Sequence, residues 1–305
     1  MVRLSNGGCS LSRRSSINNV SRINELAMKV NLHFSMLLTA LFCATLLSAQ
    51  QPTLVKRWQT DTMLTTCESV LFDAKWQLLY VSNIEGNPSV KDGKGSIATV
   101  ALDGKIINKA WITGLNAPKG MALYKNMLWF SDVDELVAVD KRNGKIVQRV
   151  KVEGANFLND VTVTTAGVVY VSDSGTKKVH RWAKGRLTTY LDSLQGPNGL
   201  LAVGKDLYVL DAGKLLKVGA NKKQVIIAQG MEGSTDGIEQ VRPNEFLVSC
   251  WSGVVYYVKS DGTTQQLLDT RTEKSNTADI GYDAKKRIVY VPTFFKNQVV
   301  AYELK

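Results

Sequence analysis

The sequence has few of the residues that build nucleophile–base pairs or zinc sites. Its 305 residues include only 2 histidines and 4 cysteines. We expect His180 on an outer strand, a surface position away from the functional site. A Ser–His–Asp arrangement for acyl transfer is therefore excluded, and a structural zinc site is disfavoured because it prefers histidine and cysteine ligands.

Two further patterns are missing beyond the first 50 residues. No segment of useful length has helical periodicity, and no basic stripe interleaves with aromatic residues. The net charge is +11, but the lysines are scattered through turns such as LDGK (102–105) and KRNGK (141–145). This scattering excludes nucleic acid as a partner.

The N-terminal part has the composition of a targeting segment. Residues 28–49 contain Lys29, an apolar run and then the small residues Ser48 and Ala49, which predicts a signal peptide cleaved after Ala49. The apolar run is shorter than the roughly 20 residues of a membrane span. We therefore expect an exported protein, periplasmic or secreted, without a stable membrane anchor. Residues 1–27 are interpreted as a non-native extension from a mis-called start, with Met28 as the true start.

The remaining two cysteines are Cys67 and Cys250. In an exported protein they could pair. However, they fall in the first and the fifth of the repeats described next. Because those repeats are not neighbours, we predict buried free thiols.

A short apolar phrase recurs six times. Its copies are LLYVSN (78–83), LWFSD (128–132), VYVSD (169–173), LYVLD (207–211), FLVSC (246–250) and VYVPT (289–293). The steps between equivalent positions are 49, 41, 38, 39 and 43 residues. Periods near forty with several short strands per repeat are typical of a β-propeller.

The repeats read as four-stranded blades. In the third repeat, residues 160–165, 168–173, 178–183 and 187–192 alternate apolar and polar side chains between glycine-containing turns, which predicts antiparallel strands. The sixth repeat lacks a fourth strand, and residues 54–60 are available to supply it. The predicted fold is an all-β, six-bladed propeller over residues 50–305, closed by its N-terminal strand.

A polar phrase precedes each predicted first strand. The phrases are CES (67–69), APKG (117–120), FLND (157–160), GPNG (196–199), STDG (234–237) and NTAD (276–279). We expect their side chains to meet at the channel mouth: Glu68, Lys119, Asn159, Asp160, Asn198, Asp236 and Asp279. Carboxylates and amides converging from several blades are hard oxygen donors, which suit Ca²⁺ or another hard divalent cation.

Across about residues 54–305, these phrases resemble the senescence marker protein/gluconolactonase/luciferin-regenerating enzyme family of six-bladed propellers. The resemblance implies one divalent metal held by Glu68, Asn159, Asn198 and Asp236. Ca²⁺ is the first choice, and Mg²⁺, Mn²⁺ or Zn²⁺ are alternatives. It also implies hydrolysis of a lactone, ester or phosphoester, with Asp236 as the catalytic base.

The chain departs from the family at two phrases. Ser69 and the apolar residues after it replace the proline and tryptophan that usually follow the first glutamate. Phe157 replaces the arginine that holds sugar acids, so we expect a less hydroxylated small-molecule substrate. The predicted substrate-binding residues are Lys119, Phe157, Asp160 and Asp279.

Other interpretations remain open. Asn-Asp, Pro-Asn-Gly and Asp-Gly also form tight turns with positive φ and no metal. The competing function is a non-catalytic exported propeller that binds a ligand or a partner protein. A strictosidine synthase-like propeller, with a channel glutamate acting as base without metal, is a third option. A monomer is assumed.

Overall fold

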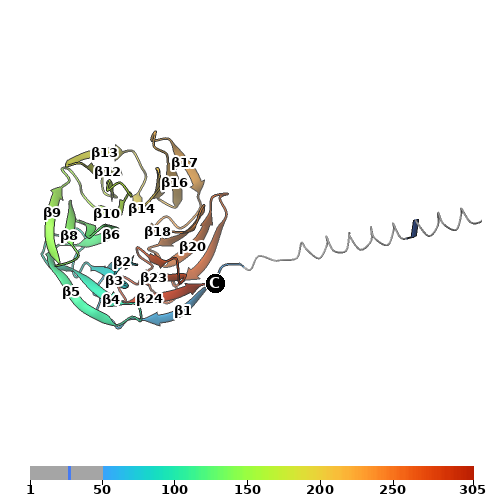
Figure 1. Ribbon diagram of the computed structural model, residues 1–305, viewed down its shortest axis with the longest axis horizontal. Helices are drawn as coiled ribbons and strands as arrows, with labels where there is room; N and C mark the ends of the chain where they lie inside the picture. Colours follow the sequence, from blue (N-terminus) through green and yellow to red (C-terminus); the bar gives the residue numbers. More distant parts are fainter. Residues whose placement is uncertain (1–26, 29–50) are drawn as a thin grey trace, which may run out of the picture. The chain divides into compact units, whose positions relative to one another are not determined.

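The computed structural model describes residues 27–28 and 51–305. Residues Pro52–Lys305 form one compact unit, a ring of six four-stranded antiparallel sheets (Figure 1). The predicted all-β, six-bladed propeller is thus confirmed. Within the described residues, no helix is long and apolar enough to cross a membrane. The predicted signal peptide and the extension before it lie almost entirely outside the described residues.

Each blade contributes one strand to each of four layers, from the channel outward. The innermost strands are β2 (Cys67–Asp73), β6 (Pro118–Tyr124), β10 (Leu158–Val163), β14 (Pro197–Val203), β18 (Thr235–Arg242) and β22 (Gly281–Asp283). The second strands are β3 (Leu78–Asn83), β7 (Met127–Asp132), β11 (Val169–Asp173), β15 (Asp206–Asp211), β19 (Glu245–Cys250) and β23 (Ile288–Pro292). The third strands are β4 (Gly95–Ala101), β8 (Glu135–Asp140), β12 (Lys178–Ala183), β16 (Lys214–Val218), β20 (Val254–Lys259) and β24 (Val299–Leu304). The outermost strands are β5 (Ile106–Leu115), β9 (Lys145–Lys151), β13 (Arg186–Leu191), β17 (Gln224–Ala228), β21 (Thr264–Asp269) and β1 (Leu54–Gln59).

The N-terminal strand closes the ring as predicted. β1 pairs antiparallel with β24, so the sixth sheet has the order β1-β24-β23-β22 (Figure 1). Trp58 of β1 packs against Tyr290 of β23, with ring centroids 5.8 Å apart. The pairing covers a sheet edge that would otherwise be open.

The hydrophobic core is divided among the spaces between neighbouring blades. One cluster joins Tyr80 and Ile97 of blade 1 to Met121 and Phe130 of blade 2, and each of these side chains is buried. The recurring apolar phrase supplies such residues in every blade, because alternate side chains of the second strand face opposite neighbours. The packing explains the period of the sequence.

Two local predictions can be judged here. Cys67 and Cys250 are both buried free thiols, as predicted, and burial raises the pKa of each to about 12. The first strand of blade 3 begins at Leu158, earlier than expected. All but the first residue of the polar phrase therefore lies inside the strand instead of before it. The same holds in blades 2, 4 and 5, and in blade 1 the whole phrase lies inside the strand.

Candidate functional site

A cavity of about 470 Å³ opens where the innermost strands begin. Its lining includes one charged or amide side chain from the innermost strand of each of five blades: Glu68, Lys119, Asn159, Asn198 and Asp236. Its other walls include the apolar side chains of Ile84, Pro88, Phe157, Trp251, Phe294 and Phe295. The structure thus brings together all four predicted metal ligands and two of the predicted substrate-binding residues, Lys119 and Phe157.

The five polar residues share a backbone feature that positions them. Each lies where the pairing of the first strand with the second shifts register: after Cys67, Pro118, Leu158, Pro197 and Thr235. Such bulges take residues out of the regular ladder and redirect their side chains. The bulges therefore explain why a polar residue of five of the six innermost strands reaches the cavity.

Serines of the second strands support these bulges. Ser82, Ser172 and Ser249 accept hydrogen bonds from the backbone amides of Ser69, Asp160 and Gly237, at 3.0, 2.9 and 2.8 Å. Each of the three serines is fully buried. The serine of the recurring phrase thus satisfies an amide that the bulge removes from the ladder.

In blades 2, 3 and 4, the aspartate that ends the recurring phrase holds the segment before the first strand of its own blade. Asp132, Asp173 and Asp211 accept backbone amide hydrogen bonds from residues 116–117, 156–157 and 195–196. In blade 3, the adjacent Ser172 and Asp173 thus both position the site. In the sequence, these serines and aspartates were recognisable only as part of the recurring phrase.

The positive-φ turn interpretation of the polar phrases is wrong. None of Asn159, Asn198 and Asp236 has a positive φ. The glycines in these phrases instead permit close approach between blades. A Cβ on Gly237 would lie 2.5 Å from the amide nitrogen of Ile280 in blade 6. Turn formation therefore does not account for the polar residues beside these glycines.

Glu68 and Asp236 are buried carboxyls with few partners. Glu68 is 5% exposed, and its Oε2 has no hydrogen-bond partner within the described residues. Burial, followed by the charges of Asp236 and Asp279, raises the pKa of Glu68 well above its usual value. Burial and the charge of Asp279 do the same for Asp236. Two such carboxyls in one cavity favour either bound protons or a cation.

The two asparagines orient their amides toward neighbouring groups. Asn198 donates its Nδ2 to Oδ1 of Asp236 at 2.8 Å, and its own Oδ1 is buried without a partner in the described chain. Asn159 donates its Nδ2 to Ser174 Oγ at 3.3 Å. Ser174 in turn donates to the carbonyl oxygen of Pro197 at 2.6 Å, which links blades 3 and 4.

The donor set fits a hard divalent cation. Glu68 Oε2 and Asn198 Oδ1 are the two fully buried side-chain oxygens of the cavity that lack partners within the described residues, and both belong to predicted ligands. Oxygens of carboxylates and amides are the ligands that Ca²⁺ prefers. Over the described part of the chain, no three His, Cys, Asp or Glu side chains form a metal-binding group. A cation here would therefore depend on the asparagines as well as on the two carboxylates.

Lys119 is buried in the cavity instead of solvated. Its Nζ donates to the carbonyl oxygens of Pro88 at 3.0 Å and Ala117 at 3.1 Å, and it lies 4.4 Å from the ring centroid of Phe157. Burial lowers its pKa to about 8, although the charge of Glu68 opposes that shift. An ammonium has three N–H donors, so one remains for a group in the cavity.

Asp160 and Asp279 do not line this cavity. They line a second one, of about 220 Å³, together with residues farther along the innermost strands. Asp160 accepts the backbone amide of Leu200 at 2.6 Å, and Asp279 accepts the hydroxyl of Ser69 at 2.5 Å. Both contacts join one blade to the next. The cavity therefore gives no support to their predicted substrate contact.

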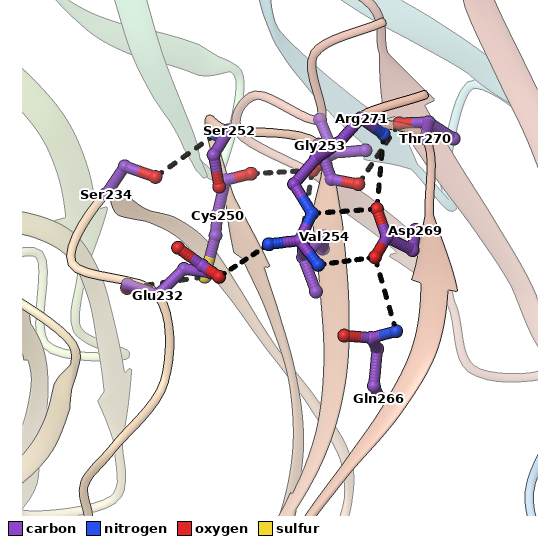
Figure 2. A network of polar contacts seen from close by, with 11 residues as sticks. Glu232, Ser234, Cys250, Ser252, Gly253, Val254, Gln266, Asp269, Thr270 and Arg271 are labelled. Carbon is purple, nitrogen blue, oxygen red and sulfur yellow. Dashed lines mark hydrogen bonds and ion pairs between the residues drawn. The ribbon is translucent and has the colours of Figure 1, made fainter. Parts of the chain in front are cut away.

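A polar network holds the segment before Asp236. In Figure 2, Arg271 bridges Asp269 of its own blade and Glu232 of this segment, with N–O distances of 2.5 and 2.7 Å. Ser234 accepts the amide of Ser252 on its Oγ at 3.1 Å, and its carbonyl oxygen accepts the amide of Trp251 at 2.8 Å. The network ties the segment before Asp236 to the turn that carries Trp251.

His180 lies on β12, the third strand of blade 3, and does not line the cavity. It is buried, contrary to the surface position expected, with Nε2 3.8 Å from Asp173 Oδ2. The cavity residues that sequence reasoning missed include Ser174, Trp251, Phe294 and Phe295. The aromatic residues follow the ends of the recurring phrase in blades 5 and 6, which is the signal that was available.

Comparison with known proteins yields structural matches alone. No family model matches the chain, and no curated protein matches it. A catalytically inactive histidine-to-alanine variant of virginiamycin B lyase from Staphylococcus aureus, with quinupristin, is 12% identical at a TM-score of 0.59, covering 84% of this chain and 99% of that chain. The selenomethionine-substituted form of that lyase is 10% identical at a TM-score of 0.57, and the match covers 84% of this chain and 100% of that chain. The likeness is one of fold. Membership of the gluconolactonase-like family stays a prediction.

Proposed function

We propose that this propeller binds one divalent cation, Ca²⁺ first, in the 470 Å³ cavity and hydrolyses a small lactone, ester or phosphoester there. The observation that carries the proposal is the pair of buried oxygens without partners in the described chain, Glu68 Oε2 and Asn198 Oδ1. A buried carboxylate with an unpaired oxygen is costly, and a cation would satisfy both atoms. We further propose that the protein is exported and that it acts on small molecules as a monomer.

Glu68, Asn159, Asn198 and Asp236 would hold the ion. When bound, a divalent cation polarises a carbonyl or phosphoryl oxygen and lowers the pKa of water. The residues of the chain supply the remaining steps. Asp236, oriented by the amide of Asn198, takes a proton from the attacking water. The bond to the leaving oxygen then breaks, and that oxygen receives the proton. The free N–H of Lys119 donates to the charge that develops on the substrate.

The chemistry of the matched lyase is not part of this proposal. The catalytically inactive form of that lyase has alanine in place of a histidine. In this chain the described residues contain His180 as their one histidine, and it lies outside the cavity.

The first test is thermal unfolding of the protein with excess Ca²⁺ and with a chelator. A ligand present at a hundred times its dissociation constant stabilises the folded state by about 2.7 kcal/mol. We expect that gain in the wild type and its loss in Asp236→Asn, together with metal-dependent hydrolysis in a panel of lactones, esters and phosphoesters. Protons compete with the cation for carboxyls of raised pKa, so the gain should be larger at pH 8 than at pH 6.

Asp283→Asn is the matched control. Asp283 is a buried aspartate outside the cavity that accepts backbone amides from Lys285 and Lys286, which asparagine can also accept. This variant should keep the response to Ca²⁺. If no divalent cation changes the melting temperature of the wild type, the hydrolase proposal fails and a ligand-binding propeller replaces it. If the cation binds but no substrate turns over, the cation only braces the channel.

A further inference from the structure

Three aromatic side chains stand at the edge of the cavity between blades 5 and 6. Trp251 lies in the turn after β19, and Phe294 and Phe295 follow β23. Trp251 is 38% exposed and Phe295 is 64% exposed, and all three line the cavity. We call this group the aromatic edge. Such exposure of large apolar side chains marks a binding surface when they are contiguous with a pocket.

The backbone of the aromatic edge is strained at one residue and is held by hydrogen bonds near it. Phe294 has a φ of +49°, a conformation that bulky residues rarely adopt. The Nδ2 of Asn276 donates to the carbonyl oxygen of Trp251 at 2.9 Å, and Asn297 Oδ1 accepts the amide of Thr66 at 2.8 Å. Strain that surrounding contacts maintain is typical of functional sites. The exposed rings are thus preorganised.

The rings themselves indicate the shape of what they bind. Phe294 meets Trp251 at 80° and Phe295 at 90°, with centroids 5.5 and 4.7 Å apart. Trp251 and Phe295 are also nearly perpendicular, at 78°. No two of these three rings are parallel, so they form no slot for a planar ring. A flexible chain, in contrast, can follow their faces and edges.

The same cavity connects the aromatic edge to the polar floor, formed by Glu68 and Asp236. Ile84 and Phe157 extend the apolar lining beyond the aromatic edge, and the polar floor lies in the same 470 Å³ space. We propose that the aromatic edge binds an unbranched apolar chain of the substrate while the polar floor takes its ester or lactone group. This inference rests on the proposed function, and it names the substrate class as lactones or esters with an alkyl or acyl chain.

The experiment measures binding without turnover. Cyclopentanones with alkyl chains from ethyl to octyl mimic the lactone ring and cannot be hydrolysed. Their affinity for the full-chain protein is measured by calorimetry, in Ca²⁺ and in chelator. Each added methylene should tighten binding about fourfold until the aromatic edge is covered. The double variant Trp251→Ser, Phe295→Ser should lose most of that dependence on chain length.

Trp76→Ser is the matched control, because Trp76 is 37% exposed and does not line the cavity. It should keep the full dependence on chain length. If the double variant does not fold, the single variant Phe295→Ser replaces it in the experiment, because Phe295 is the most exposed of the three rings. An affinity that does not change with chain length in the wild type, or a dependence that survives in the variants, overturns the inference.

These outcomes separate the two proposals. Chain-length dependence without any metal-dependent hydrolysis supports the aromatic edge and contradicts the proposed function. Hydrolysis of an unsubstituted lactone, combined with equal binding of all chain lengths, supports the function and contradicts the apolar subsite.

Discussion

At the scale of single residues, the site depends on charged groups removed from water. Lys119 is 1% exposed, and none of the ion pairs among the described residues includes it. Two backbone carbonyls and a phenyl ring surround its ammonium. Burial of a cation in such surroundings favours its neutral form, so Lys119 changes charge near physiological pH. A lysine on the surface, with a pKa of about 10.4, stays charged at that pH.

The buried Lys119 predicts a characteristic dependence of stability on pH. Its pKa is about 8 in the folded state and near 10.5 when exposed. Below pH 8 the folded protein carries the full cost of the buried charge, and that cost disappears as the pH rises from 8 to 10.5. We expect the melting temperature of the wild type, relative to Lys119→Met, to rise between pH 7 and pH 9.5. Melting curves of both proteins test this, and a constant difference would contradict the assigned burial.

At the scale of elements, the innermost strands build the site by departing from regular pairing. The bulge in β18 contains Asp236, and Ser249 of β19 supports it. Ser249 Oγ accepts the amide of Gly237 at 2.8 Å and donates to the carbonyl oxygen of Ala278 at 2.7 Å. One hydroxyl thus ties the bulge to its own blade and to the next.

Ser249→Ala should be more costly than a surface substitution. It leaves a buried amide and a buried carbonyl without a partner, at about 1–3 kcal/mol of unfolding free energy. Because the bulge orients Asp236, affinity for the cation should fall as well. Ser252→Ala is the control, since the hydroxyl of Ser252 has no partner within the described residues. Denaturant unfolding and Ca²⁺ titration measure both effects, and equal stability of the two variants would refute the role of Ser249.

At the scale of the whole molecule, the ring depends on pairing between the two ends of the propeller. β1 covers the edge of β24, and Trp58 packs near Tyr290. A cluster of buried residues from blades 6 and 1, including Tyr290 and Val70, lies beside this closure. Glu68 belongs to blade 1, so closure of the ring also positions this carboxyl group in the cavity.

Removing residues 1–60 should therefore destabilise the propeller. Loss of a packed tryptophan alone costs about 3 kcal/mol or more, which lowers the melting temperature by about 6–12 °C in a protein of this size. The exposed edge of β24 should also promote aggregation. A chain that begins at Pro52 retains β1 and should melt like the full chain. Calorimetry and light scattering compare the two truncations, and similar melting temperatures would show that β1 is dispensable.

The sequence alone determined the propeller, its six blades and its closure. The apolar phrase repeats because each second strand packs against two neighbours, and that requirement is local enough to appear in the order of residues. The same reasoning identified the lining residues Glu68, Asn159, Asn198 and Asp236, since their phrases follow the period of the blades. Their role as metal ligands stays a prediction.

Only the tertiary structure decided how the polar residues divide between two cavities. Asn159 and Asp160 are adjacent in the chain, yet Asn159 lines the first cavity and Asp160 lines the second. A bulge determines which of two neighbouring side chains faces which way, and pairing with another strand defines the bulge. The sequence places these aromatic residues directly after the recurring phrase, but only the tertiary structure brings them together as the aromatic edge. Trp251 and Phe294 are 43 residues apart in the chain. They meet because residues 276–278 bond to both segments: Thr277 Oγ1 donates to the carbonyl oxygen of Cys250 at 2.8 Å, and the amide of Ala278 donates to the carbonyl oxygen of Pro292 at 3.0 Å.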